Sequence, residues 1–268
     1  MIAAQTVAFG EYGGYAAWPE LASAPIPAVI VLQEAWGVNE HIEDVTRRIA
    51  AAGYYAVAPD LFARNGARPV ALSRERVAGT VQFFNSMPPG GWANPDLLKA
   101  ALAKLPSDAA ARIDESRAAI FGLLGKSAEL LPIIRAAASF LTETNDLTKG
   151  AKLGAVGFCM GGGLSGLLAC HEPRLSAAAV FYGMPPPVEE IASIACPILG
   201  FYGGLDARIN SALPAFEAAM NGAGKRFEKH VYENTQHAFF NDGRPSYQVN
   251  AARDAWAHLL AFFRGALA

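Results

Sequence analysis

The chain has 268 residues, of which 52% are hydrophobic and 17% are charged, and its formal net charge at pH 7 is −2. This composition provides for a large apolar core and argues against intrinsic disorder. The near balance of charges gives no basic surface for a polyanion, so we expect no nucleic-acid partner.

The sequence also argues against a membrane or secreted protein. No apolar run approaches the roughly 20 residues of a membrane-spanning helix, and the first residues lack the basic stretch of a signal peptide. The three cysteines, Cys159, Cys170 and Cys196, form neither a disulfide framework nor a metal-binding spacing. We therefore expect a cytoplasmic monomer or homodimer without metal or cofactor, in which Cys170 and Cys196 are small buried residues.

Strands and helices are predicted to alternate along the chain. An N-terminal hairpin around Gly13 and Gly14 comes first. Strands are then expected at 27–33, 54–58, 152–157, 176–181, 197–203 and 227–232. Helices are expected at 40–52, 71–86, 95–145, 160–170, 211–222 and 246–265. The alternation predicts one α/β domain over residues 1–268, with a mostly parallel central sheet covered by helices on both faces.

Residues 85–130 are more than such a sheet needs and read as a helical insertion. Leu97, Leu98, Leu102 and Leu105 follow helical spacing, and a second helical run leads to Leu124. The insertion is either a mobile lid over a site or additional outer packing, and the sequence does not distinguish the two.

The most informative motif is Gly157-Phe158-Cys159-Met160-Gly161, which follows a predicted strand and opens a predicted helix. A Gly-x-nucleophile-x-Gly turn in this context is a nucleophile elbow, in which glycines allow a sharp turn and the central side chain is exposed over the sheet edge. Cys159 would then be a thiol nucleophile beside a helix N-terminus, which favours negative charge. The alternative is a buried cysteine in a turn whose glycines serve packing alone.

An elbow nucleophile needs an acid and a histidine, in that chain order. Asp206 follows the strand at 197–203 and His237 follows the strand at 227–232, so both lie past strand ends. We expect Asp206 to orient His237 and His237 to exchange a proton with Cys159. Asp206 is alternatively a helix cap and His237 an ordinary loop residue, and His230 is the rival base.

Two backbone N–H groups should complete an oxyanion hole. Met160, the residue after the nucleophile, supplies one. The other is expected from Ala35, in the loop after the strand at 27–33.

Several blocks resemble the dienelactone hydrolases (carboxymethylenebutenolidases), a family of the α/β-hydrolase superfamily. They are the elbow itself and Gln33–Asn39, Gly53–Phe62, Phe181–Gly183, Gly204–Asp206 and His237–Phe239, and the likeness covers most of residues 26–262. The resemblance implies an α/β-hydrolase fold, the triad Cys159, His237 and Asp206, and a place in aromatic degradation. It also implies that Glu34 engages the nucleophile in the resting state, whereas the alternative is a solvated loop carboxylate.

The likeness is incomplete in the part that holds the substrate. The family binds a substrate carboxylate with arginines, and Arg76 matches one such position. The second position is Asn241 here, with Arg244 three residues further on as a possible replacement. Trp36, Tyr182 and Phe239 are expected to line the substrate pocket.

The leading hypothesis is hydrolysis of a small lactone or ester through an acyl-enzyme on Cys159. A broader carboxylesterase, thioesterase or acyltransferase with the same triad is the first alternative, and a non-catalytic binding protein on a hydrolase fold is the second. A redox thiol is disfavoured because no resolving cysteine neighbours Cys159 in the sequence.

Overall fold

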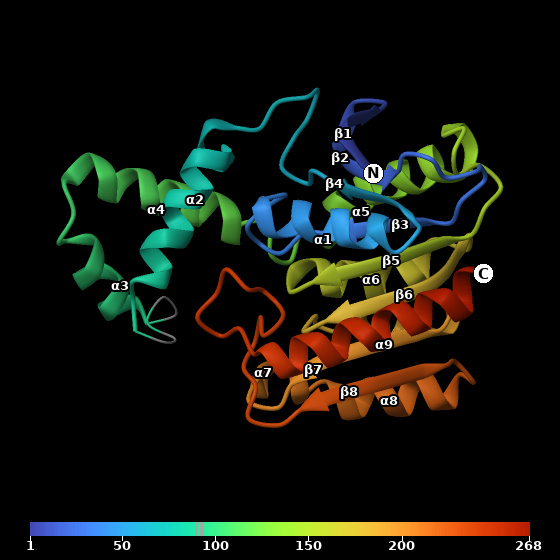
Figure 1. The fold of residues 1–268 in the computed structure, drawn as a ribbon. Coiled ribbons are helices and arrows are strands. Elements are labelled where there is room, and N and C mark those ends of the chain that lie inside the picture. The colour runs from blue at the N-terminus through green and yellow to red at the C-terminus, as the bar shows by residue number, and fades with distance from the viewer. Residues whose placement is uncertain (89–90, 92–93) are drawn as a thin grey trace.

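The computed structural model describes residues 1–88, 91 and 94–268, and its centre is an eight-stranded sheet (Figure 1). The strand order across the sheet is β1-β2-β4-β3-β5-β6-β7-β8. The strands are β1 (Ile2–Phe9), β2 (Tyr12–Pro19), β3 (Ala28–Leu32), β4 (Tyr55–Pro59), β5 (Leu153–Phe158), β6 (Leu175–Phe181), β7 (Ile198–Gly203) and β8 (Phe227–Tyr232). From β4 to β8 all pairings are parallel, so the predicted mostly parallel sheet is confirmed.

The N-terminal hairpin is present, but its turn is not where we expected it. Phe9 pairs with Tyr12, so the chain turns at Gly10 and Glu11, and Gly10 has a φ of 69°. Gly13 and Gly14 lie inside β2. A Cβ on Gly14 would come within 2.3 Å of the Ala58 carbonyl oxygen, so this glycine permits close pairing with β4 rather than a turn.

Helices cover both faces of the sheet, as the alternation predicted (Figure 1). On one face, α1 (Glu40–Ala51) and α9 (Val249–Leu267) pack on residues such as Val31 and Phe201. On the other face, α5 (Ser127–Ser139), α6 (Met160–His171) and α8 (Leu213–Gly222) pack on residues such as Ile30 and Leu32. Alternate residues of β3 thus enter opposite core layers, and the whole strand is buried.

The segment 95–145, predicted to be filled by helices, contains three of them. They are α3 (Pro95–Leu102), α4 (Ser107–Phe121) and α5, followed by a π-helical turn, η3 (Phe140–Thr144). Pro106 precedes α4, and Gly125, with a φ of 90°, lies between α4 and α5. Neither residue fits a helix interior, which explains the two breaks. The predicted helix at 211–222 corresponds to α8, and a short helix that was not predicted, α7 (Ala207–Asn210), precedes it.

Helices α2 (Arg74–Asn85), α3 and α4 form an arm beside the sheet body (Figure 1). Ile120 of α4 and Val77 of α2 join Leu72, Phe62 and Ala35 in a small apolar cluster separate from the two main core layers. The arm therefore rests on the loop that follows β3. Residues 89–90 and 92–93 of the predicted insertion lie outside the described residues, and among the described helices none is both long and apolar enough to span a membrane.

Candidate active site

The turn between β5 and α6 has the geometry of a nucleophile elbow. Cys159 lies at the turn with φ 55° and ψ −113°, a conformation that side-chain-bearing residues rarely adopt. A Cβ on Gly157 would lie 1.8 Å from the Gly161 carbonyl oxygen, and one on Gly161 would lie 2.3 Å from that of Leu32. Only glycine fits at either position. The strained backbone of Cys159 costs about 1–3 kcal/mol, and such a conformation persists only where the surrounding structure enforces it.

Parallel pairing brings the candidate acid and base to the same sheet edge as Cys159. The loop after β7 carries Asp206, and the loop after β8 carries His237. Gly203 allows the two loops to meet, because a Cβ there would lie 2.5 Å from the Thr235 carbonyl oxygen. The resulting distance from His237 Nδ1 to Asp206 Oδ2 is 2.5 Å.

Asp206 has two roles at once. Its Oδ1 accepts from the backbone N–H of Ile209 at 3.4 Å and so caps the short helix α7, while Oδ2 bonds His237. The capping alternative for Asp206 is therefore correct, and it does not compete with orientation of the imidazole because each role uses a different oxygen.

The electrostatics of the pair favour a charged imidazole. Burial lowers the pKa of His237, but its hydrogen bond to Asp206 and its interaction with Cys159 outweigh this and raise the pKa to about 10. Burial also works against ionisation of Asp206, yet the hydrogen bond and charge of His237 hold the pKa of that carboxyl below its usual value. At neutral pH the site therefore contains an imidazolium held by a carboxylate and adjacent to the Cys159 sulfur.

Glu34 is not the solvated loop residue of the alternative interpretation. Its side chain lies at the end of β3 with only 1% of the residue exposed. One carboxylate oxygen accepts from the Tyr182 hydroxyl at 3.2 Å and the other from Asn241 Nδ2 at 2.7 Å. Both oxygens are thus engaged by partners other than Cys159, which differs from the direct resting-state contact that the family resemblance implied.

Tyr182 interacts with both this carboxylate and Cys159. Burial, the charge of Glu34 and the charge of Cys159 raise its pKa well above the ordinary value, in that order of importance. Tyr182 also has a φ of 40°, so the chain is strained where it places this side chain after β6. The hydroxyl remains protonated at neutral pH and can donate to Glu34.

The proposed oxyanion donors lie on adjacent loops. Leu32 at the end of β3 pairs with Gly157 of β5, so the loop carrying Ala35 runs beside the elbow. Met160 is the first residue of α6, where backbone N–H groups have no partner within their own helix. The sheet register therefore brings both loops to the same edge.

Trp36 links the arm to the site. Its indole contacts the rings of Phe84 and Phe121 at centroid distances of 5.9 and 6.1 Å. On the same indole, the Arg244 guanidinium carbon lies 5.3 Å from the ring centroid. One nitrogen of Arg244, NH1, is buried without a hydrogen-bond partner among the described residues, and its charge influences Tyr182. Arg244 therefore presents an unsatisfied cationic donor near the Glu34–Tyr182 pair.

Three of the residues expected to bind substrate are placed differently. The Arg76 guanidinium bonds Glu115 at 2.7 Å, the Arg112 carbonyl oxygen at 2.7 Å and the Ser116 hydroxyl at 3.2 Å, all on α4. Arg76 thus fastens α2 to α4. Phe239 and Tyr182 are both fully buried, and their rings pack against each other. Both side chains therefore belong to the core beneath the candidate site and do not line a pocket.

The other cysteines and the rival base are not part of this constellation. Burial raises the pKa of Cys170 to about 11 and of Cys196 to about 12, which makes both poor nucleophiles. His230 interacts with Glu228 and stacks on His258. Because its partners Glu228, His258 and Phe201 lie within β8, α9 and β7, away from Cys159, His230 does not replace His237.

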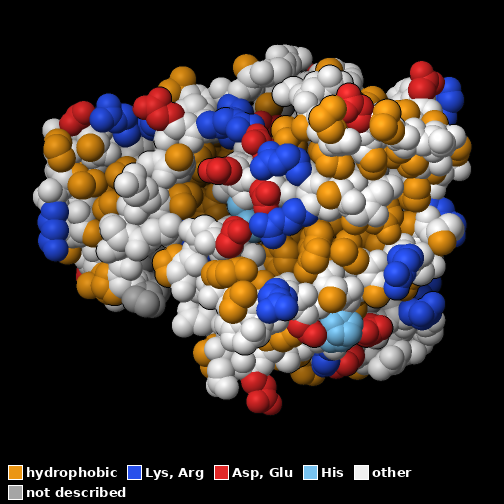
Figure 2. Space-filling model, in the orientation of Figure 1, with side chains coloured by type: hydrophobic (Ala, Val, Ile, Leu, Met, Phe, Trp, Pro, Cys, Tyr) orange, Lys and Arg blue, Asp and Glu red, His pale blue; other side chains and the backbone are white. Residues whose placement is uncertain are grey.

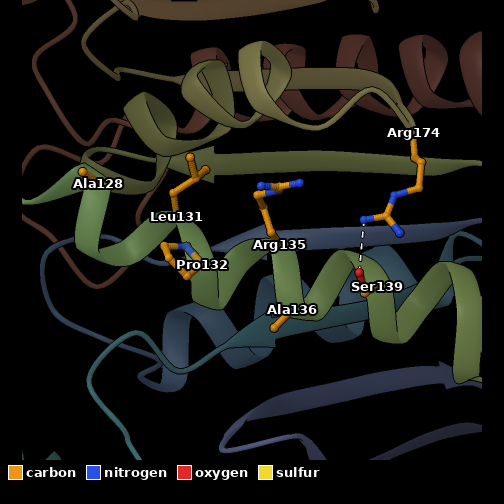
Figure 3. A pocket seen from close by; sticks show the side chains of 7 residues that line it. All are labelled: Ala128, Leu131, Pro132, Arg135, Ala136, Ser139 and Arg174. Carbon is orange, nitrogen blue, oxygen red and sulfur yellow. Dashed lines mark hydrogen bonds between the residues drawn. The ribbon is translucent and has the colours of Figure 1, made fainter.

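A hollow of ≈ 410 Å³ lies elsewhere, beside α5 (Figure 3). Arg174 on its rim immediately precedes β6 and donates to Ser139 at 3.2 Å, so the hollow lies at the amino end of that strand, opposite the triad edge. Arg174 and Arg135 both pair with the buried carboxylate of Glu172, at 2.6 and 3.8 Å. Glu143 also pairs with Arg174, so two carboxylates balance the two guanidinium charges, and the hollow is no part of the candidate site.

A family model described as the dienelactone hydrolase family matches residues 12–267. The chain belongs to the dienelactone hydrolase family. A Saccharolobus solfataricus protein named "Putative carboxymethylenebutenolidase" is 35% identical over 241 residues, which are 90% of each chain. A Methylorubrum extorquens protein of the same name is 32% identical over 266 residues, covering 95% of this chain and 77% of the relative.

Solved structures agree with this membership. A crystal structure titled as that of a dienelactone hydrolase from Klebsiella pneumoniae has a TM-score of 0.71 at 30% identity, covering 98% of this chain and 99% of the other. An acylaminoacyl peptidase of Pyrococcus horikoshii, at 13% identity and a TM-score of 0.64, covers 99% of this chain and 42% of its own and shares the fold alone. The predicted α/β-hydrolase fold is confirmed. The predicted class of activity, hydrolysis of carboxylic esters, is confirmed as well.

Proposed function

We propose that this dienelactone hydrolase family member cleaves a small lactone or ester by nucleophilic catalysis, with Cys159, His237 and Asp206 as the triad. The observation that supports this most strongly is the strained Cys159 turn at the same sheet edge as the 2.5 Å His237–Asp206 pair. A nucleophile elbow requires a strained turn of this kind, with glycine two residues before and two residues after the nucleophile.

The first chemical step is attack of Cys159 Sγ on the acyl carbon. The charge that develops on the carbonyl oxygen is held by the N–H groups of Ala35 and Met160. Collapse of this intermediate breaks the bond from the acyl carbon to the ester oxygen. The protonated His237 gives its proton to the departing alkoxide, and Asp206 stabilises the imidazole throughout. The product of this half-reaction is a thioester on Cys159.

The second step is hydrolysis of the thioester. His237, now neutral, takes a proton from water, and the resulting hydroxide attacks the same acyl carbon. Breakage of the carbon–sulfur bond releases the carboxylic acid and regenerates the sulfur beside an imidazolium. For a lactone the alkoxide of the first step stays on the same molecule, so one ring-opened hydroxy acid leaves.

Glu34 and Tyr182 tune the nucleophile in this proposal. The buried Glu34 carboxylate accepts a hydrogen bond from the Tyr182 hydroxyl, and that hydroxyl interacts electrostatically with both Glu34 and Cys159. A shift of the Tyr182 hydrogen bond from Glu34 toward the sulfur would stabilise negative charge on Cys159 while substrate is bound.

Arg244 is the proposed recognition group for an acidic substrate. One of its nitrogens is buried with no hydrogen-bond partner among the described residues, and its guanidinium lies over Trp36, so it is available for a carboxylate. Arg76 is instead committed to α4. A charge-assisted hydrogen bond contributes about 1.5–3 kcal/mol, so Arg244→Met should raise KM for an acidic lactone about 10- to 100-fold. The kcat/KM for an uncharged aryl ester should change little.

The deciding experiment compares a dienelactone with a neutral aryl ester in wild type and Cys159→Ala. Hydrolysis of the dienelactone that disappears with the substitution supports the proposal. Turnover of neutral esters alone would support the triad but favour a broader esterase or thioesterase. The observation that favours this second function is Asn241, which stands where the family has a substrate-binding arginine. Folded wild-type protein that turns over neither substrate would contradict the catalytic proposal.

A further inference from the structure

Two histidines and two carboxylates gather on the outer surface formed by β8 and α9. Alternate residues of β8 face α9, namely Glu228, His230 and Tyr232. Asp254 and His258 of α9 lie one helical turn apart and meet them. Figure 2 shows this histidine surface, in pale blue, with acidic side chains on both sides of it, over β8 and α9.

The distances suit a metal ion. One ligand atom from each of Glu228, His230 and His258 lies within 4.8 Å of the others. Glu228 Oε1 is already 3.1 Å from His230 Nε2. A tetrahedral zinc ion with bonds of about 2.0–2.2 Å places its ligand atoms roughly 3.3–3.6 Å apart. The three side chains therefore need to close by only about 1 Å, which is within reach of small rotamer changes.

Neighbouring residues hold part of this cluster in place. The His230 ring stacks on Phe201 of β7 at 5.6 Å and on His258 at 4.0 Å, so it is fixed from both sides. Asp254 accepts from the Tyr232 hydroxyl at 2.8 Å and lies 3.6 Å from His258 Nε2. Asp254 is thereby positioned to orient His258 from outside the ligand set, as carboxylates often do for metal-bound histidine.

The donor chemistry restricts which ion would bind. Two imidazole nitrogens and one carboxylate suit Zn²⁺, Ni²⁺, Co²⁺ or Cu²⁺, whereas Ca²⁺ and Mg²⁺ prefer oxygen ligands alone. Glu228 and His258 have 70% and 44% of their side-chain surface exposed, so an ion can enter from solvent.

We propose that Glu228, His230 and His258 form a surface site for a divalent transition metal of the Zn²⁺ type. Because β8 is the edge strand of the sheet, an ion shared with α9 would fasten that edge. The loop that carries His237 begins where β8 ends, so an ion that fixes β8 would also stabilise the start of that loop. The site is separate from the triad and does not depend on the proposed function.

Metal titration by calorimetry tests this site. The full chain is used with Cys159→Ala, which removes a partly accessible thiol as a competing ligand. Titration with Zn²⁺, and separately with Co²⁺, should show one ion per chain. His230→Ala and His258→Ala should each weaken binding by at least about tenfold, since loss of even an outer partner costs about 10- to 100-fold. Glu228→Gln should weaken it in the same direction.

His171→Ala is the matched control, because His171 pairs with Glu190 at 2.7 Å on another face and should leave metal affinity unchanged. Zn²⁺ should also raise the Tm of the parent chain and not that of His258→Ala, whose exposed helical position tolerates alanine. The absence of saturable binding up to about 1 mM metal, or equal affinity in both histidine variants and their parent, would overturn the proposal.

Discussion

Removal of the Tyr182 hydroxyl tests whether Glu34 is a buried carboxylate held by two donors. Tyr182→Phe keeps the ring and its packing on Phe239, and deletes one hydrogen bond to an oxygen with no access to water. Hydrogen bonds to charged groups contribute about 1.5–3 kcal/mol. At 3.2 Å this bond is long for a hydroxyl donor, so we expect the lower part of that range, about 1.5–2 kcal/mol.

The bond from Asn241 provides an internal comparison. At 2.7 Å it is the shorter of the two, so Asn241→Ala should destabilise the fold more than Tyr182→Phe does. In a chain of this size 1 kcal/mol corresponds to roughly 2–4 °C, and Tyr182→Phe should therefore lower Tm by about 3–8 °C. Urea unfolding followed by fluorescence and calorimetry would measure both quantities.

A double-mutant cycle assigns the loss to the carboxylate. In a Glu34→Gln background the charge is absent, and Tyr182→Phe should cost only about 0.5–1.5 kcal/mol. Tyr202→Phe is the control, because Tyr202 is also fully buried but packs in the other core layer, and its effect should not depend on Glu34. Equal losses from Tyr182→Phe with and without the Glu34 carboxylate would refute the reasoning.

Three further predictions concern the triad and its turn. Asp206→Asn should lower kcat by about 10⁴-fold while the fold is retained, measured by ester turnover and circular dichroism. Because folding raises the pKa of His237 to about 10, its protonation stabilises the fold fully below about pH 6.5, and this contribution is lost as pH rises toward 10. His237→Gln should flatten the plot of unfolding free energy against pH over that range. An unchanged plot would contradict the raised pKa of His237. Gly161→Ala should prevent folding or strongly destabilise the chain, since its Cβ would lie 2.3 Å from the Leu32 carbonyl oxygen. Gly265→Ala in α9, where a Cβ has open space, should instead stabilise by roughly 0.5–1 kcal/mol, and similar results for both glycines would show that the close approach is unimportant.

Local chemistry predicted most of the parallel sheet and the triad positions. The strand–turn–helix around Cys159 followed from glycine spacing, and Asp206 and His237 followed from their places after apolar strands. The prediction of the parallel sheet is confirmed. Parallel strands end at one edge of the sheet, so residues just past strand ends are brought together whatever lies between them in sequence. The roles of Cys159, Asp206 and His237 stay predictions.

The predictions for substrate-binding residues were less successful. Arg76 was chosen by resemblance, yet three acceptors on α4 hold its guanidinium. Asn241 was noted only as a missing arginine, and its hydrogen bond to Glu34 has no signature in the sequence. Glu34 and Asn241 are 207 positions apart in the sequence. Their contact depends on how the loops pack, which no local sequence pattern encodes.

The sequence by itself predicted the α/β fold class and the positions of Cys159, Asp206 and His237 after strands, because periodicity and glycine spacing act over a few residues. The family followed from the resemblance of its motifs, and the family model confirms it. Only the tertiary structure decided that Glu34 is buried between Tyr182 and Asn241. The same is true of Arg244, whose guanidinium over Trp36 has one donor without a partner in the part of the chain that the structure describes. The same holds for Glu228, His230 and His258, which show no metal-binding spacing along the chain. They meet because an edge strand and the last helix pack together, and such long-range contacts arise from burial of the whole core rather than from neighbouring residues.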